Sequence, residues 1–245
     1  MSRASVERGK SPGAEFEESA VAQVGVGPHP EPWPDDPRLD RALLAEGDRR
    51  NVIDRYRYWS VEAITKDLDE RRFEFHVAIE NWKHDLNIGT VVRNANAFMA
   101  ARVHIVGAHR WNRRGAMCTD RYVHIEHHAS VDHFVEAMAS HAPRREIVGV
   151  DLLPGSVLID RVALPRSCVL VFGQEGVGLS EAMRARCGRL CAIAQFGSTR
   201  SINAGVASGI AMHQWIVQHG AHETARLYGE GAVSGVAAPA ARRVE

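Results

Sequence analysis

The sequence predicts an α/β protein in which a mainly parallel sheet is flanked by helices. Short apolar runs alternate along the chain with segments that have helical periodicity. The run Cys168–Phe172 is apolar throughout, as expected of a parallel strand that is covered on both faces. A glycine-rich segment follows this run, and open α/β sheets bind ligands at the carboxyl ends of their strands.

The elements of this fold follow in order from the periodicity. The first strand is predicted where Phe73, Phe75, Val77 and Ile79 alternate with other residues. Further strands are predicted at 103–106, 123–126, 146–153, 168–172 and 190–194, and helices at 88–100, 131–140, 180–187 and 202–218. The last helix is predicted to present one face made of Ile202, Val206, Ile210, His213 and Val217.

Four segments are predicted along the chain. Residues 1–35 form a disordered tail and 36–70 a helical extension, 71–222 form the α/β domain, and 223–245 form a flexible tail. The first segment holds five prolines and almost no aromatic residues, which is typical of disorder. Helices are expected in the extension at 38–46 and 60–70, the first of them beginning at Asp36-Pro37.

Composition narrows the class of protein. The chain has 245 residues, of which 45% are hydrophobic, enough for one domain with extensions. Its net charge of +0 does not indicate a nucleic-acid protein, so RNA binding would need local basic patches. No apolar run approaches the roughly 18 residues of a membrane span, and the polar start lacks a secretory signal. A cytoplasmic protein without a membrane segment is expected.

No metal site is predicted. The four cysteines, Cys118, Cys168, Cys187 and Cys191, include no C-x-x-C pair, and no other cluster of metal ligands is evident. Buried, reduced thiols are expected instead.

Two segments are candidates for RNA contact. Residues 49–59 interleave arginines, among them Arg55 and Arg57, with aromatic residues, a pattern suited to phosphates and stacked bases. The alternative is that Tyr56 and Trp59 pack on the domain. Residues 102–145 are rich in arginine and histidine, and Arg110, Arg113 and Arg114 fall in a predicted loop there; a solvated face is the alternative.

The glycine-rich segment could suggest a phosphate-binding loop. Gly173 and Gly178 have the G-x-x-x-x-G spacing, and Ser180 occupies the Ser/Thr position. Leu179, however, stands where the phosphate-binding lysine would be, which argues against nucleotide hydrolysis. The glycine pattern alone leaves a purely structural turn open.

Three motifs in order resemble the SpoU/TrmH branch of the SPOUT RNA methyltransferases, over roughly residues 71–220. They are N-x-G-x-x-x-R at Asn87, Gly89 and Arg93, then the turn at Gly173, Glu175, Gly178 and Ser180, then Ile193, Gly197, Ser201, Ile202 and Asn203. The chain departs from the family at Ala194-Gln195, where I-P-M is common, and after Asn203.

This resemblance implies a deep C-terminal trefoil knot and a homodimer that pairs through helices beside it. It also implies transfer of a methyl group from S-adenosyl-L-methionine to a ribose 2′-hydroxyl of tRNA or rRNA, without a metal. The alternative is a non-catalytic RNA-binding module that keeps the fold.

The resemblance also implies roles for individual residues. Arg93 is expected to hold an RNA phosphate and stabilise the developing alkoxide, since a guanidinium stays protonated and is a poor base. Glu175 is expected to orient Arg93 or accept a proton, while Asn87 and Asn203 bind the ribose or cap helices. His84 is a further candidate RNA contact. The expected cofactor residues are Leu152, Gly173, Gly178, Ile193, Ser201 and Ile202.

Overall fold

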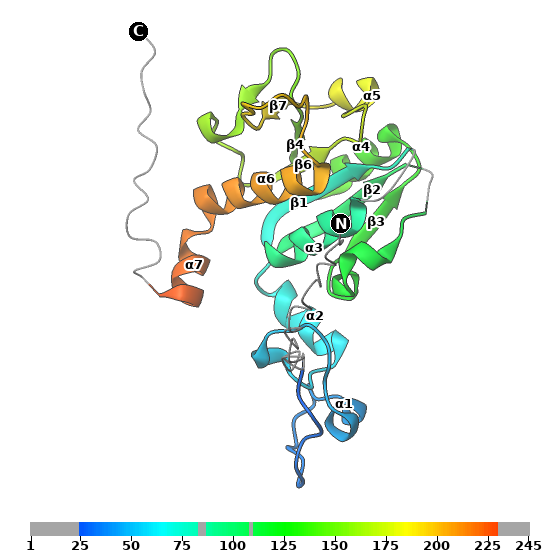
Figure 1. The fold of residues 1–245 in the computed structure, drawn as a ribbon, viewed down its shortest axis with the longest axis vertical. Helices are drawn as coiled ribbons and strands as arrows, with labels where there is room; N and C mark the ends of the chain where they lie inside the picture. The colour runs from blue at the N-terminus through cyan, green and yellow to red at the C-terminus, as the bar shows by residue number, and fades with distance from the viewer. Residues whose placement is uncertain (1–24, 83–86, 108–109, 230–245) are drawn as a thin grey trace, which may run out of the picture. The chain divides into compact units, whose positions relative to one another are not determined.

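The computed structural model describes residues 25–82, 87–107 and 110–229 of the chain (Figure 1). The chain divides into two units, residues 1–63 and 64–245. The boundary predicted at residue 70 therefore lies too late, and helix α2 (Val61–Asp69) runs across the division.

The second unit is built on a seven-stranded sheet in the order β3-β2-β1-β6-β4-β7-β5, in which every strand pair is parallel. This confirms the predicted α/β class. The strands are β1 (Phe73–Glu80), β2 (Ala100–Val106), β3 (Ile125–His128), β4 (Glu146–Val150), β5 (Val157–Leu158), β6 (Cys168–Phe172) and β7 (Arg189–Ala192).

Helices cover both faces of this sheet, so the unit has three layers. Buried side chains of α3 (Ile88–Ala97) and α6 (Ala204–His219) share one core with one face of the strands. Those of α4 (Val131–Ser140) and α5 (Glu181–Arg184) share a second core with the other face. The remaining helices are α1 (Arg41–Glu46), α7 (Ala221–Tyr228) and the 3-10 turns Asp54–Tyr56, Arg113–Ala116, Thr119–Arg121 and Ile159–Arg161.

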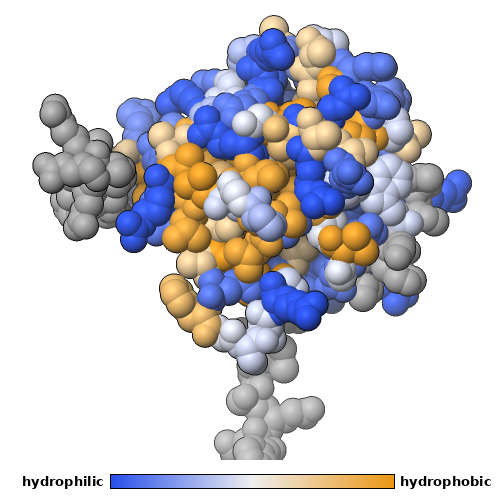
Figure 2. All heavy atoms as spheres, turned by 90° about the horizontal axis from the view of Figure 1, so that it is seen from above, coloured by the Kyte–Doolittle hydropathy of each residue, from blue (hydrophilic) through white to orange (hydrophobic). Residues whose placement is uncertain are grey.

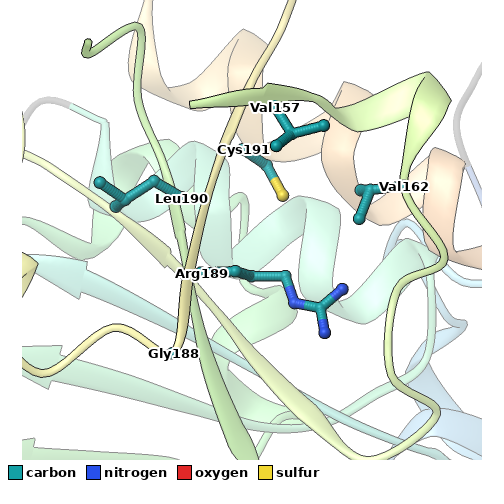
Figure 3. A pocket seen from close by; sticks show the side chains of 6 residues that line it. All are labelled: Val157, Val162, Gly188, Arg189, Leu190 and Cys191. Carbon is teal, nitrogen blue, oxygen red and sulfur yellow. The ribbon is translucent and has the colours of Figure 1, made fainter. Parts of the chain in front are cut away.

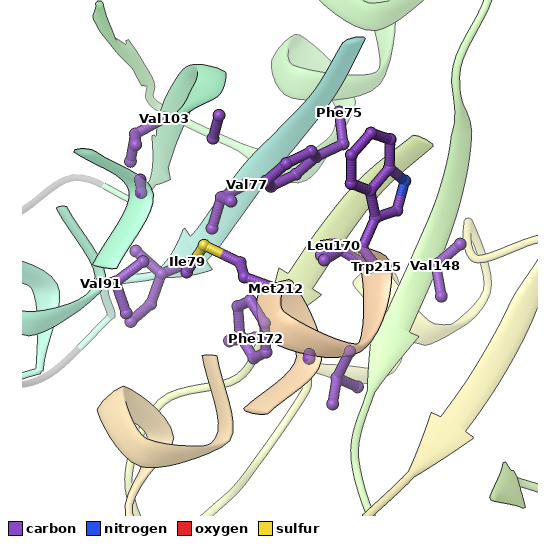
Figure 4. Close-up of a cluster of buried hydrophobic side chains, with 14 of the residues drawn as sticks. Phe75, Val77, Ile79, Val91, Val103, Val148, Leu170, Phe172, Met212 and Trp215 are labelled. Atoms are coloured by element: carbon purple, nitrogen blue, oxygen red, sulfur yellow. The ribbon is translucent and has the colours of Figure 1, made fainter. Parts of the chain in front are cut away.

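Aromatic side chains fill the core under α6 (Figure 4). The ring of Trp215 lies 4.5 Å from that of Phe75 and 5.3 Å from that of Phe73, measured between centroids. Its indole nitrogen donates to the carbonyl of Pro165 at 3.1 Å, so the polar end of the ring is satisfied. Full burial of one such side chain contributes about 1.5–3 kcal/mol, which anchors α6 to the sheet.

The C-terminal helices differ from the prediction in two ways. Val206, Ile210 and Val217 lie exposed, because α6 buries the face that carries Trp215 and small residues such as Ser208. Residues 223–228, which were predicted to belong to a flexible tail, are part of α7, and the predicted tail from residue 230 lies outside the described residues.

The first unit contains ordered structure where a tail was predicted. Val26 and Asp48 form an antiparallel bridge, and the amide of His29 donates to the carbonyl of Leu44, so residues 25–35 do not fit the predicted disorder. Helix α1 begins at Arg41 with Asp40 as its cap, three residues later than the predicted start. Asp36 instead accepts hydrogen bonds from Arg38.

A buried carboxylate organises this unit. Asp48 accepts hydrogen bonds from the backbone and guanidinium of Arg50 and from the amide of Tyr58. Burial raises the pKa of Asp48, but these hydrogen bonds outweigh it and lower the pKa to about 2. Beside it, Tyr56 and Trp59 are buried and meet edge to face at 5.4 Å, which favours packing over base stacking for these rings.

Histidines line the α4 face of the sheet. His76 on β1, His104 on β2 and His128 on β3 are all buried, and adjacent imidazoles lie within hydrogen-bonding distance. Burial lowers the pKa of His76 to about 3 and that of His104 to about 2, so both are neutral at pH 7. Strand pairing thus creates a cluster of ligand-type side chains that the sequence analysis does not anticipate.

Strand order alone does not define how the chain threads, so the deep knot stays a prediction.

Among the helices of the described segments, none is long and apolar enough to cross a membrane.

Candidate functional site

The three motifs meet through a triangle of side chains. The amide of Asn87 donates to Oε1 of Glu175 at 2.8 Å. The amide of Asn203 donates to Oδ1 of Asn87 at 2.8 Å and to the same Glu175 oxygen at 3.1 Å. Residues at the start of α3, in the turn after β6 and at the start of α6 are therefore held together. The structure brings together three of the four predicted catalytic residues by direct hydrogen bonds.

Both asparagines stand at helix starts, but they serve differently. Asn203 caps α6, since its Oδ1 accepts the amide of Val206 at 3.1 Å. Asn87 precedes α3 and makes no side-chain cap bond there, so its amide is wholly committed to the triangle. The helix-cap alternative is thus correct for Asn203 in addition to its bond with Glu175.

The glycines of the second motif close the turn that carries Glu175. A side chain at Gly173 would collide with the backbone of Gly178, 2.0 Å away, so the chain folds back on itself only with glycine here. Gly178 has a φ of 74°, which favours glycine, and its amide donates to the carbonyl of Gln174 at 3.0 Å. The glycine spacing therefore builds a tight turn that presents Glu175 at the surface.

Two carboxylates that the sequence reasoning missed hold this turn to the sheet. Asp151, after β4, accepts the amide of Leu179 at 2.9 Å. Glu80, at the end of β1, accepts the amide of Ser180 at 2.7 Å and its hydroxyl at 2.6 Å. Ser180 in turn caps α5. The only sequence signal for the role of Glu80 is that it is an acidic residue directly after the strand predicted at 73–79.

Arg93 lies on the exposed side of α3. Within the described ranges its guanidinium has no hydrogen-bond or ion-pair partner, so it is available to an anionic ligand. The next residue, Asn94, donates to the carbonyl of Gly205 at 2.9 Å and to the hydroxyl of Ser208 at 3.0 Å. Asn94 thus fixes α3 against α6; the motif spacing did not reveal this role.

A basic loop packs against the start of α3. The Cα of Gly89 approaches the backbone of Gly115 so closely that a Cβ would lie 2.6 Å from it. Gly115 belongs to the turn that carries the predicted RNA contacts Arg113 and Arg114, both exposed, and Arg110 is exposed just before it. Arg113 makes a long ion pair of 3.5 Å with Asp120.

The predicted cofactor residues lie on the loops after β4, β6 and β7 and before α6. Gly173 is buried, Ile193 and Ile202 are partly buried, and Leu152 and Ser201 are exposed. The side-chain oxygens of Gln174 and Gln195, in the loops after β6 and β7, are buried and have no hydrogen-bond partner within the described part of the chain. Such orphaned acceptors fit a site for a polar ligand.

A separate pocket of about 260 Å³ opens at the β5 edge of the sheet and contains none of these residues. In Figure 3 the side chains of Arg189 and Cys191 point towards Val157 and Val162, and Leu190 points away. Arg189 is paired with Glu146 at 2.6 Å.

The remaining predicted RNA contacts lie elsewhere. His84 falls outside the described residues. The guanidinium of Arg55 lies over the ring of Tyr56 at 5.6 Å. Arg57 donates to the carbonyl of Arg50 at 2.7 Å and is largely buried, so we withdraw it as a candidate contact.

A glycine turn and the polar triangle lie at the carboxyl ends of the parallel strands. This arrangement defines a class of α/β domains, those that bind ligands beyond the carboxyl ends of their strands. The chain matches the SpoU rRNA Methylase family over residues 74–213 and belongs to that family. This confirms the resemblance seen in the three motifs.

Known proteins similar to this chain include an uncharacterized tRNA/rRNA methyltransferase of Mycolicibacterium smegmatis. It is 31% identical over 143 residues, which are 56% of this chain and 44% of that protein. The chain thus spans less than half the length of this relative.

Solved structures agree on the fold. An AdoMet-bound rRNA methyltransferase from Sinorhizobium meliloti is 25% identical with a TM-score of 0.53, covering 61% of this chain and 59% of that one. A TrmH/SpoU tRNA modifying enzyme from A. aeolicus has a TM-score of 0.58 at 22% identity, covering 66% of this chain and 84% of that one. At this identity the second likeness concerns the fold alone.

Proposed function

We propose that the protein transfers a methyl group from S-adenosyl-L-methionine to a ribose 2′-hydroxyl of tRNA or rRNA. The observation that carries the proposal is the hydrogen-bonded triangle of Asn87, Glu175 and Asn203. Asn87 directly precedes α3, and this helix carries Arg93, whose guanidinium has no partner among the described residues. Membership of the SpoU rRNA Methylase family supports RNA methylation. The AdoMet-bound rRNA methyltransferase among the similar structures supports the cofactor.

The cofactor is expected in the loops after β6 and β7. Orphaned oxygens of Gln174 and Gln195 are suited to accept N–H groups of a ligand. Ile193 and Ile202 are partly buried, so they can cover an apolar ring surface while backbone groups read its edge. When bound, the cofactor supplies a methyl group on a sulfonium, already activated for transfer.

The protein's own residues then position the RNA and handle charge. Arg93 holds an RNA phosphate and stabilises the alkoxide that develops at the 2′-oxygen. Glu175 uses Oε1 for the two asparagines, and Oε2 orients Arg93 or accepts the proton of the hydroxyl. Asn87 and Asn203 hold the Glu175 carboxylate in place, so little free energy is needed to reorient it during the reaction.

The RNA surface is expected to extend from Arg93 to the basic loop. Arg110, Arg113 and Arg114 are exposed, and the Gly89–Gly115 contact fixes their loop against the start of α3. Such a cluster can bind backbone phosphates even though the whole chain is neutral.

A homodimer is proposed on the exposed side of α6. The exposed apolar side chains of α6 are Val206, Ile210 and Val217. Figure 2 shows that hydrophobic residues gather on one face of the molecule. An apolar helix face next to the proposed cofactor loops fits pairing with a second copy.

The experiment is incubation of the purified protein with isotope-labelled S-adenosyl-L-methionine and total RNA from cells lacking the gene. We expect label in a 2′-O-methylated nucleoside, which digestion and mass spectrometry identify and primer-extension mapping locates. Label on a base would contradict the ribose assignment. RNA binding without any label would instead support a non-catalytic module.

A further inference from the structure

We infer that His104, Glu126 and His128 form a binding site for a divalent transition-metal ion of the zinc type. The side chains come from the neighbouring strands β2 and β3, and their ligand atoms all lie within 4.8 Å of one another. This inference does not rest on the proposed methyltransferase activity, because the cluster contains none of the motif residues.

Strand register creates the cluster. His104 on β2 pairs directly with Glu126 on β3. His128 lies two residues beyond Glu126, and alternate residues of a strand share one face of a sheet. The backbone of the parallel pair therefore places three ligand-type side chains on the same face, which α4 covers.

The distances suit one shared ion. Nδ1 of His104 lies 3.0 Å from Nε2 of His128, while Oε2 of Glu126 lies 3.4 Å from the first nitrogen and 3.9 Å from the second. A zinc ion bonds nitrogen and carboxylate oxygen at about 2.0–2.2 Å, so the two nitrogens would subtend roughly 95° at the ion. Separating them by a few tenths of an ångström gives a tetrahedral angle.

Neighbouring groups orient the ligand atoms towards that point. Nδ1 of His76 lies 2.8 Å from Nε2 of His104, which fixes the ring and leaves Nδ1 of His104 facing the cluster. Arg102 binds Oε1 of Glu126 at 2.7 Å and leaves Oε2 facing the histidines. The ring of Phe134 packs against both imidazoles, with centroids at 5.5 and 5.4 Å, and excludes water from that side.

Hydrogen bonding within the protein satisfies the cluster only in part. One proton shared by Nδ1 of His104 and Nε2 of His128 makes the bond of 3.0 Å, while Oε2 of Glu126 faces these nitrogens at 3.4 and 3.9 Å. A cation bound by Nδ1 of His104, Nε2 of His128 and Oε2 of Glu126 would use one lone pair of each atom. A single proton between the two imidazoles joins only the nitrogens.

The site has an open side. His141 directly follows α4 and is partly exposed, and its Nε2 lies 3.9 Å from the same Glu126 oxygen. His141 or water would complete four-fold coordination, and this side is the entry path. The ion would join edge strand β3 to β2 and to the end of α4, a structural role.

The test uses the full-length protein without a histidine tag, stripped of metal by a chelator and then titrated with Zn²⁺. We expect about one ion per chain and a melting temperature raised by several degrees. Co²⁺ added in place of Zn²⁺ should give the visible absorption of a four-coordinate nitrogen and oxygen site. Glu126→Gln should weaken Zn²⁺ affinity by at least about 100-fold, because it removes a direct ligand.

The matched control is His127→Gln, one residue along the same strand with an exposed side chain. It should bind Zn²⁺ like the parent protein. The melting temperatures of Glu126→Gln and of the parent protein, both measured in chelator, show whether the variant is folded. His128→Gln, at the second ligand position on β3, repeats the test. Absence of saturable binding, or affinity unchanged in both ligand variants, would overturn the inference.

Discussion

At the scale of the residue, Arg93 provides the sharpest test of the proposed chemistry. Arg93→Ala should lower methyl transfer by about 100–1,000-fold, the loss typical of one donor to a developing oxyanion. Its exposed position on α3 indicates that neither folding nor cofactor affinity depends on it. Single-turnover transfer and calorimetric titration with S-adenosyl-L-methionine measure the two effects separately.

Arg161→Ala is the control for Arg93, since Arg161 is also exposed and pairs with its neighbour Asp160. Near-normal transfer by Arg93→Ala would refute the role assigned to the guanidinium.

Asn203 combines two functions that substitutions can separate. Asn203→Ser keeps an oxygen to cap α6 but removes the amide that reaches Glu175, so transfer should fall while the melting temperature stays close to normal. Asn203→Ala removes both and should also cost about 0.5–2 kcal/mol of stability. Thermal unfolding beside transfer assays distinguishes these outcomes. Equal activity of Asn203→Ser and the parent would mean that Asn203 is merely a cap.

At the scale of the element, the first unit depends on one buried carboxylate. Asp48→Ala removes the carboxylate that accepts from the guanidinium of Arg50 and should destabilise this unit by about 3–5 kcal/mol, the cost of breaking a buried ion pair. Hydrogen exchange in peptides from residues 25–63 reports this directly. Asp36→Ala, which affects an ion pair nearer the surface, should leave the exchange unchanged.

Acid should act on the same carboxylate. Because the folded pKa of Asp48 is about 2, below its unfolded value of about 3.9, its stabilisation is complete above pH 4 and is lost as the pH falls towards 2. Exchange in the Asp48→Ala variant should therefore change less between pH 4 and 2 than in the parent. An equal change in both would show that another group controls acid unfolding.

The outer face of α6 is the element that should pair two copies. Ile210→Glu places a charge on this exposed apolar face and should yield a monomer by light scattering without lowering the melting temperature. Ile53→Glu, at an exposed site in the first unit, serves as control. A dimeric Ile210→Glu protein would exclude this face.

The same helix shows why an apolar pattern can mislead. Val206, Ile210 and Val217 form an apolar stripe but lie exposed. The buried residues of α6 are Gly205, Ser208, Ala211, Met212 and Trp215. Small residues let α6 approach α3 so closely that a Cβ at Gly205 would lie 2.7 Å from the Thr90 side chain. Because three of the five buried positions hold glycine, serine or alanine, the buried side has a weak hydrophobic signal, and the pattern predicted the apolar stripe without showing that it is exposed.

At the scale of the whole molecule, the sequence predicted most where the local pattern is decisive. The strand Cys168–Phe172 and the helix Val131–Ser140 have the predicted bounds, because unbroken apolar runs and a serine cap define them locally. The motifs named Asn87, Glu175 and Asn203 as site residues, but the contact expected at Glu175 was with Arg93, and its hydrogen-bond partners are the two asparagines. Glu80, Asn94 and the histidine cluster could not be predicted, since their partners are chosen by sheet order and register.

Metal removal should separate the two proposed sites across the molecule. Chelation should lower the melting temperature of the metal-loaded protein but leave affinity for S-adenosyl-L-methionine unchanged, because the cofactor loops and the histidine cluster share no residue. Calorimetry before and after chelation measures this. Loss of cofactor binding with the metal would contradict the separation.

The lengths of the two edge strands of the sheet affect the tendency of the protein to aggregate. The β5 edge is only two residues long, and the β3 edge only four. A neighbouring chain can add a strand only along an extended row of unpaired backbone groups, so such short borders offer little template for stacking into fibrils. The two edge strands therefore offer other chains little opportunity to extend the sheet.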